Sequence, residues 1–152
     1  MWRRRLESGR ARRHALLQWL FLAAVLNLAW EIAQLPLYTI FHQGRPGQIA
    51  FAVAHCTAGD VLIALACYLA ASAVTRDLVW PWHRPSSGGA VAIVTGVAYT
   101  VFSEWLNASV RGSWAYTESM PRISSLGLTP LLQWLAVPLV TLWLIRAGKR
   151  ST

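Results

Sequence analysis

Residues 15–36 read ALLQWLFLAAVLNLAWEIAQLP, and this stretch decides the fold. A helix of that length, rising about 1.5 Å per residue, crosses a hydrocarbon core of about 30 Å. The arginine-rich segment before it resembles the start of a secretory or twin-arginine signal peptide. However, the apolar run is too long for a signal peptide, and no small-residue cleavage site follows it. We therefore expect a helix that stays in the membrane.

Three more apolar runs lie at residues 48–74, 90–110 and 130–145. We expect a loop over residues 76–89, with Trp80 and Trp82 at the lipid headgroups, a helix cap at Thr129 and a kink at Pro138. The chain is 55% hydrophobic and 13% charged, whereas soluble domains are about 25% charged. The sequence therefore predicts one all-α domain over residues 1–152, an integral membrane four-helix bundle.

Cys56 and Cys67 both lie in the second apolar run. Their spacing places them about three helical turns apart, too far for a disulfide within one helix. Cysteines in apolar surroundings pack as small hydrophobic residues, so we expect two free thiols.

The basic residues flank the apolar runs and give the chain a net charge of +8. With four spans, the first segment, the middle connection and the last segment share one face, which carries eleven Lys and Arg residues against three on the other. Because positive segments stay on the cytoplasmic side, we expect both termini in the cytoplasm and the chain in a bacterial inner membrane. This placement indicates contact with membrane lipids and not with nucleic acid. The eleven residues are Arg3, Arg4, Arg5, Arg10, Arg12, Arg13, Arg76, Arg84, Arg146, Lys149 and Arg150, and the three are Arg45, Arg111 and Arg122.

Polar and ionisable residues interrupt the apolar runs, although a charged group costs about 2.5–3.5 kcal/mol to insert. Spacings of three and four residues place those of the first span on one helical face, and those of the third span likewise. The residues are Asn27, Glu31 and Gln34 in the first span, His55, Thr57 and Asp60 in the second, Thr100, Glu104, Asn107 and Arg111 in the third, and Gln133 in the fourth.

These residues also share a depth. The first and third spans run outward and carry them late, whereas the second and fourth run inward and carry them early. One face per helix and one depth predict a single polar cavity in the outer half of the membrane, above an apolar inner half. Alternatively, Asn and Gln residues only join helices by hydrogen bonds, and Glu31 forms a structural ion pair with Arg111.

Intramembrane ionisable groups are functional by default, and a carboxyl group in a site of low dielectric constant holds a proton that it can donate. We therefore expect Glu31 and Glu104 as acid and base, with Asp60 and His55 in support. Substrate-binding residues would be Asn27, Asn107, Trp30, Trp105, Arg111 and Gln133, and Trp114, Tyr116, Met120 and Pro121 form either a lid or an interfacial loop.

Metal or haem ligation is a weaker alternative. His55, Asp60, Glu31 and Glu104 offer mixed nitrogen and oxygen ligands, but His55 is the only histidine well inside a span and no Glu-x-x-His pair occurs. We therefore expect no cofactor and no metal.

The segment Asn27-Leu28-Ala29-Trp30-Glu31 resembles a motif of the membrane-integral terpene cyclases of fungal meroterpenoid pathways. The resemblance implies Glu31 as the acid that starts a cyclisation. It covers five residues, and the four spans here differ from the seven helices of those enzymes. The chain as a whole resembles small uncharacterised four-span bacterial membrane proteins.

These features favour an enzyme that performs acid–base chemistry, such as a cyclisation or isomerisation, on an apolar isoprenoid- or lipid-like substrate. A proton or cation transporter or channel subunit is the second interpretation, and a structural accessory subunit is the third. The sequence leaves open whether the chain forms an oligomer.

Overall fold

The structure, a computed structural model, describes the backbone of residues 2–150 and the side chains of residues 9–148. Arg3, Arg4, Arg5, Lys149 and Arg150, which contribute to the predicted orientation, lie outside the residues whose side chains are described. The described chain is helical apart from its connections, one of which contains a two-stranded antiparallel hairpin, so the predicted all-α class is confirmed. The elements in order are α1 (Trp2–Gln34), η1 (Leu35–Leu37), α2 (Thr39–Gln43), α3 (Pro46–Thr75), α4 (Trp80–His83), α5 (Pro85–Glu104), η2 (Trp105–Val110), β1 (Arg122–Ile123), β2 (Leu126–Gly127) and α6 (Leu128–Arg150).

Four segments are long and apolar enough to cross a membrane: Gly9–Leu37, Pro46–Thr75, Pro85–Val110 and Leu128–Gly148. The chain is therefore a multi-pass membrane protein by the length and composition of its helices. α1 and α6 extend beyond the predicted spans through basic segments whose residues are compatible with a helix, and α3 and α5 each begin with a proline, which is favoured at the first helical position.

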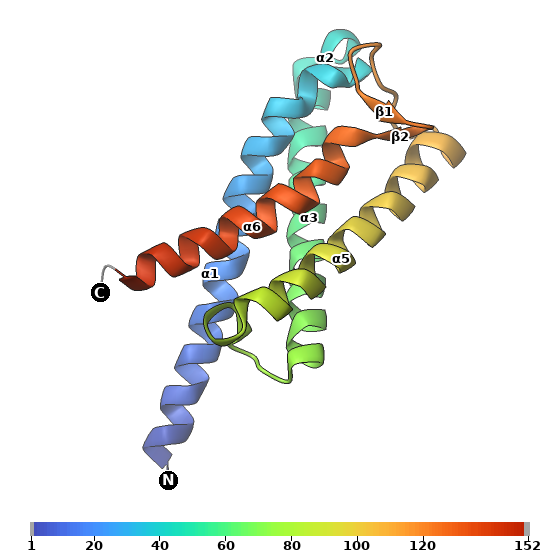
Figure 1. The fold of residues 1–152 in the computed structure, drawn as a ribbon. Coiled ribbons are helices and arrows are strands. Elements are labelled where there is room, and N and C mark those ends of the chain that lie inside the picture. The colour runs from blue at the N-terminus through green and yellow to red at the C-terminus, as the bar shows by residue number, and fades with distance from the viewer. Residues whose placement is uncertain (1, 151–152) are drawn as a thin grey trace.

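The long helices form a ring in which α1 packs on α3, α3 on α5, α5 on α6, and α6 on α1. This arrangement fits a four-helix bundle. In Figure 1, α2 and the β1–β2 hairpin lie together at one end of the molecule, which we call the hairpin end. The opposite end, which holds α4, is called the α4 end.

Aromatic side chains fill the α4 end of the bundle. Trp80 is 0% exposed, and its ring lies 5.1 Å from that of Trp19 and 5.7 Å from that of Tyr68, centroid to centroid. Gly88 makes room for it, because a Cβ atom there would collide with the Trp80 ring. Trp80 therefore does not face the lipid as a residue of an aromatic belt would: α4 turns it into the core, where its indole nitrogen donates to the carbonyl of Tyr68 at 3.3 Å.

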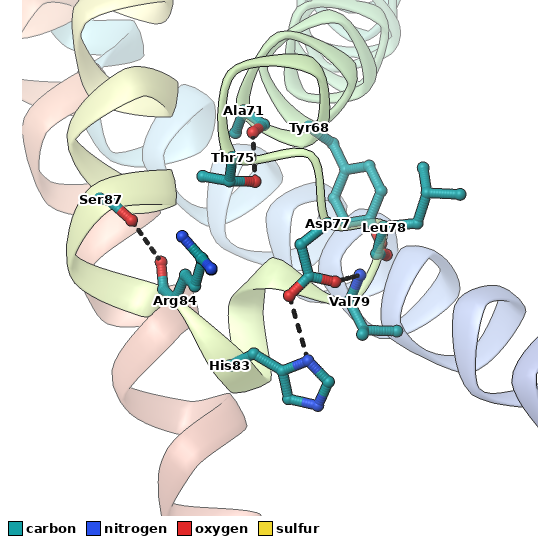
Figure 2. Close-up of polar contacts among 9 residues, drawn as sticks. All are labelled: Tyr68, Ala71, Thr75, Asp77, Leu78, Val79, His83, Arg84 and Ser87. Carbon is teal, nitrogen blue, oxygen red and sulfur yellow. Dashed lines mark hydrogen bonds and ion pairs between the residues drawn. The ribbon is translucent and has the colours of Figure 1, made fainter.

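Residues 76–89, predicted to form a loop, are more ordered than expected. They contain the short helix α4 and the first turn of α5. Asp77 organises this connection between α3 and α5, as Figure 2 shows. One carboxylate oxygen of Asp77 accepts from the backbone nitrogen of Val79 at 2.8 Å, and the other pairs with His83 Nδ1 at 3.0 Å. The Tyr68 hydroxyl donates to the carbonyl of Leu78, which ties the connection back to α3.

The hairpin end is held by two connections that pair with each other. The backbone nitrogen of Thr39 donates to the carbonyl of Ala115 at 3.0 Å, and that of Thr117 donates to the carbonyl of Leu37 at 2.9 Å. The long connection between η2 and α6 is thereby strapped onto the connection between α1 and α3.

The start of α6 differs from the prediction, and the helix is longer than the predicted span. The helix begins at Leu128, and the Thr129 hydroxyl contacts the sulfur of Met120 at 3.3 Å instead of capping the helix. The helix also continues through Pro138 to Arg150.

Candidate functional site

Gln133, in the second turn of α6, joins three helices through one nitrogen. Its Nε2 donates to Asn27 Oδ1 at 2.8 Å and to Asp60 Oδ2 at 2.9 Å, and lies 3.3 Å from Glu31 Oε1. Gln133 is 2% exposed and Asn27 is 0% exposed. An amide nitrogen carries two hydrogens, so the three acceptors compete for two donors. Gln133 therefore fixes the position of both carboxyl groups without satisfying both fully.

The carboxyl groups of Glu31 on α1 and Asp60 on α3 lie within hydrogen-bonding reach of each other. Two carboxyl groups form such a bond only when one of them carries a proton. Gln34 Nε2 donates to Glu31 Oε1 at 2.9 Å, and Trp30 Nε1 donates to Gln34 Oε1 at 3.2 Å. The spacing of three and four residues in α1 thus orients Glu31 towards Asp60, with Trp30 acting through Gln34.

Glu104, at the end of α5, has a separate set of partners. It is 5% exposed, and its Oε2 accepts a hydrogen bond from the Tyr116 hydroxyl. The backbone nitrogen of Gly127 also lies against this carboxyl group and 3.4 Å from the Tyr116 hydroxyl oxygen. The indole nitrogen of Trp114 is buried nearby without a well-formed hydrogen bond. The connection before α6 therefore supplies the donors to Glu104.

A π-helical segment, η2, follows Glu104 directly. The backbone nitrogen of Arg111 donates to the carbonyl of Leu106 five residues earlier, at 2.8 Å. Such segments change the register of side chains along a helix. Asn107 donates to the carbonyl and hydroxyl oxygens of Ser103 at 2.9 and 3.2 Å, and Arg111 is turned to the exposed surface.

A cavity of about 1050 Å³ lies in the hairpin half of the bundle. The predicted site residues that line it are Glu31, His55, Asp60, Glu104, Asn107 and Gln133. The cavity therefore brings together the four predicted catalytic residues and both amides from the third and fourth spans. Asn27 lies behind Gln133 as its hydrogen-bond acceptor.

Other predicted residues lie elsewhere. Trp105 is 50% exposed on the outer surface of η2 and packs near Phe102, and it is outside the cavity lining. Trp30 reaches the site only through Gln34. Arg111 is exposed, and no ion pair joins it to Glu31 among the described side chains. His55 is also exposed and stacks on Phe51, with the ring centroids 5.6 Å apart.

A scan of the chain with protein-family models matches no family, and comparisons with curated proteins and with solved structures find no match. In the part of the chain with described side chains, no three His, Cys, Asp or Glu residues are grouped so that they could hold a metal ion. The function must therefore be inferred from the cavity and its own residues.

Sequence reasoning missed two contributors. Tyr116 was expected only as part of a lid or interfacial loop, but it is a direct partner of Glu104. Tyr38, just after the first span, lines the cavity with its ring 5.4 Å from that of Tyr116. Burial raises the pKa of Tyr38, and the nearby carboxyl groups raise it further, so its hydroxyl keeps its proton. Only the pairing of the two connections reveals either residue.

Proposed function

We propose that the chain is a multi-pass protein of the bacterial inner membrane that performs acid–base chemistry on an apolar, isoprenoid- or lipid-like substrate. In this proposal both termini lie in the cytoplasm, and the hairpin end lies in the outer half of the membrane. The observation that carries it is the presence of two separate carboxyl sites on one cavity. One is the Glu31–Asp60 pair, and the other is Glu104 with Tyr116.

The two carboxyl sites divide the proton chemistry between them. In this proposal the Glu31–Asp60 pair shares one proton between its two carboxyl groups, and this proton is available to a substrate in the cavity that both residues line. Glu104 accepts a hydrogen bond from the Tyr116 hydroxyl, and in this proposal it removes a proton from the substrate. We assign Glu31 as the proton donor, with Asp60 as its partner, and Glu104 as the base.

The packing of the α4 end supports an enzyme over a transporter. Trp19, Tyr68 and Trp80 fill the bundle between the cavity and the α4 end. A transport path would have to pass these buried rings. A cavity with one closed end suits a substrate that enters and leaves on the same side.

The proposed reaction is a cyclisation or isomerisation of a carbon skeleton started by protonation. The five-residue segment from Asn27 to Glu31 resembles a motif of terpene cyclases. That resemblance supports the same reaction, because it also implies Glu31 as the acid. Removal of a different proton by Glu104 would complete the reaction and return the protein to its starting state after proton exchange with water.

Solvent deuterium provides a test that does not require the substrate to be known. The purified protein is reconstituted with a total bacterial lipid extract in D₂O, and the lipids are then extracted into H₂O. Deuterium on oxygen and nitrogen is lost in that step, whereas deuterium on carbon remains. We expect mass spectrometry to find carbon-bound deuterium in one lipid or isoprenoid species with the native protein and not with Glu31→Gln.

Glu118→Gln is the matched control, because Glu118 is an exposed acid in the connection before α6 and lies outside the cavity lining. It should label the same species as the native protein. Equal labelling by Glu31→Gln and the native protein, or no labelling by the native protein, would refute the proposal.

A further inference from the structure

The residues that line the cavity include acids but no Lys or Arg among those that the structure describes. Three carboxyl residues face the cavity, namely Glu31, Asp60 and Glu104. His55 is the one residue there that can become positive, and it lies exposed and stacked on Phe51. The cavity therefore has no fixed positive charge to balance its carboxyl groups.

The nearest basic residues in the sequence do not supply that charge. Arg45 is the N-cap residue before α3 and Arg111 follows η2, yet both are exposed and outside the cavity lining. The donors that face the carboxyl groups are neutral amides, a tyrosine hydroxyl and a backbone nitrogen. A ligand that carries phosphate or carboxylate would thus meet three acids and no ion-pair partner, in surroundings that screen charge poorly.

Aromatic rings form a second, independent part of the lining. Tyr38, Tyr99, Trp114 and Trp134 come from three of the spans or their connections, and all four line the cavity. The faces of Tyr and Trp rings attract cations, and the attraction grows when water is excluded. Carboxyl groups and aromatic rings on one cavity are complementary to an organic cation with an apolar body.

We infer that the cavity selects a lipophilic organic cation, with an amine or ammonium charge on an apolar body, and rejects anionic lipids and isoprenoid diphosphates. As a statement about substrate the inference rests on the proposed function, and it narrows the substrate class to molecules without phosphate. The volume of about 1050 Å³ is ample for such a ligand, since pockets for drug-sized molecules span about 300–1,000 Å³.

Two probes of the same shape and opposite charge test this directly. Tetraphenylphosphonium carries one positive charge and tetraphenylborate one negative charge, each inside four phenyl rings. Radiolabelled forms are equilibrated with the full chain in nanodiscs of zwitterionic lipid, and bound ion is measured at increasing concentration. We expect saturable binding of tetraphenylphosphonium at one site, and only non-saturable partition of tetraphenylborate into the lipid.

A cavity-filling variant separates site binding from partition. Gly59 lines the cavity beside Asp60, and a Cβ atom added there would meet no atom within 4 Å. Gly59→Phe should therefore fold, as judged by an unchanged elution volume and melting temperature, and abolish saturable binding. Glu104→Gln should weaken tetraphenylphosphonium binding about tenfold or more, because it removes the carboxylate that is proposed to act as the base and that faces the cation. Glu118→Gln should leave it unchanged.

Saturable tetraphenylborate binding that Gly59→Phe abolishes would overturn the inference, as would tetraphenylphosphonium binding that neither Gly59→Phe nor Glu104→Gln weakens. The absence of saturable binding of either ion would overturn it too. These outcomes are independent of the deuterium experiment. Cation-selective binding without carbon labelling would refute the proposed reaction alone, and labelling without cation selectivity would refute the inference alone.

Discussion

At the scale of single residues, the site has fewer hydrogen-bond donors than acceptors, and one amide nitrogen faces three acceptors. Gln133 donates to Asn27 and Asp60 and lies against Glu31, so three helices share one buried amide. We expect Gln133→Leu to lower the free energy of unfolding by about 1–3 kcal/mol, because buried acceptors would lose their donor. Unfolding in detergent with increasing dodecyl sulfate measures this. The same change at exposed Gln43 should have little effect, and a similar loss at both positions would contradict the role of Gln133.

Tyr116 offers a second prediction at this scale. Its hydroxyl donates to Glu104, so Tyr116→Phe removes one hydrogen bond and leaves the ring in place. We expect deuterium incorporation to fall about tenfold or more, since a hydrogen bond to a charged group is worth about 1.5–3 kcal/mol. Tyr99→Phe is the matched control, because Tyr99 also lines the cavity but is half exposed. Unchanged labelling in Tyr116→Phe would remove Tyr116 from the site.

The sequence predicted the residues of the site better than their partners. The spacing of Glu31 and Gln34 within one helix was enough to place them on one face, and the structure joins them at 2.9 Å. The contacts of Gln133 span more than 70 residues of chain, and no spacing rule predicts which of several buried acceptors an amide will reach. Tyr116 lies in a connection whose path depends on backbone pairing with another connection, so its contact with Glu104 was not predictable.

At the scale of elements, a close contact of α5 with α6 sets the width of the bundle below the cavity. A Cβ atom at Gly96 would collide with the ring of Trp134, which is 2% exposed. We expect Gly96→Ala to destabilise the protein by about 1–3 kcal/mol, because the helices must move apart or Trp134 must leave its rotamer. Gly59→Ala is the control, since Gly59 has open space around it. Equal melting temperatures for the two variants would contradict this account of the packing.

Two elements of the fold, α4 and η2, could not be predicted from patterns in the sequence. Hydrophobic runs identified all four spans but not α4, because its Trp-Pro-Trp sequence reads equally well as an interfacial loop. The structure buries Trp80 there since Gly88 leaves room for its ring. The π segment was likewise not predictable: its five-residue hydrogen bonding moves Arg111 off the stripe that ideal helical spacing predicts.

At the scale of the whole molecule, the bundle consists of a half with a polar cavity and a half packed with apolar rings. The sequence predicted this division from the order of polar residues along alternating spans. The two native cysteines fall on opposite sides of it. Cys56 is half-buried and lines the cavity, whereas Cys67 is fully buried in the core with Trp80.

Thiol labelling of the native chain therefore tests the central claim most directly. Intact spheroplasts that express the protein are treated with a small membrane-impermeant thiol reagent, and the modified cysteine is identified by peptide mass spectrometry. We expect modification of Cys56 from outside the cell, modification of Cys67 only after denaturation, and loss of labelling at Cys56 in Gly59→Phe. Modification of Cys67 in the folded protein, or of Cys56 only after the membrane is opened to the cytoplasmic side, would contradict the central claim.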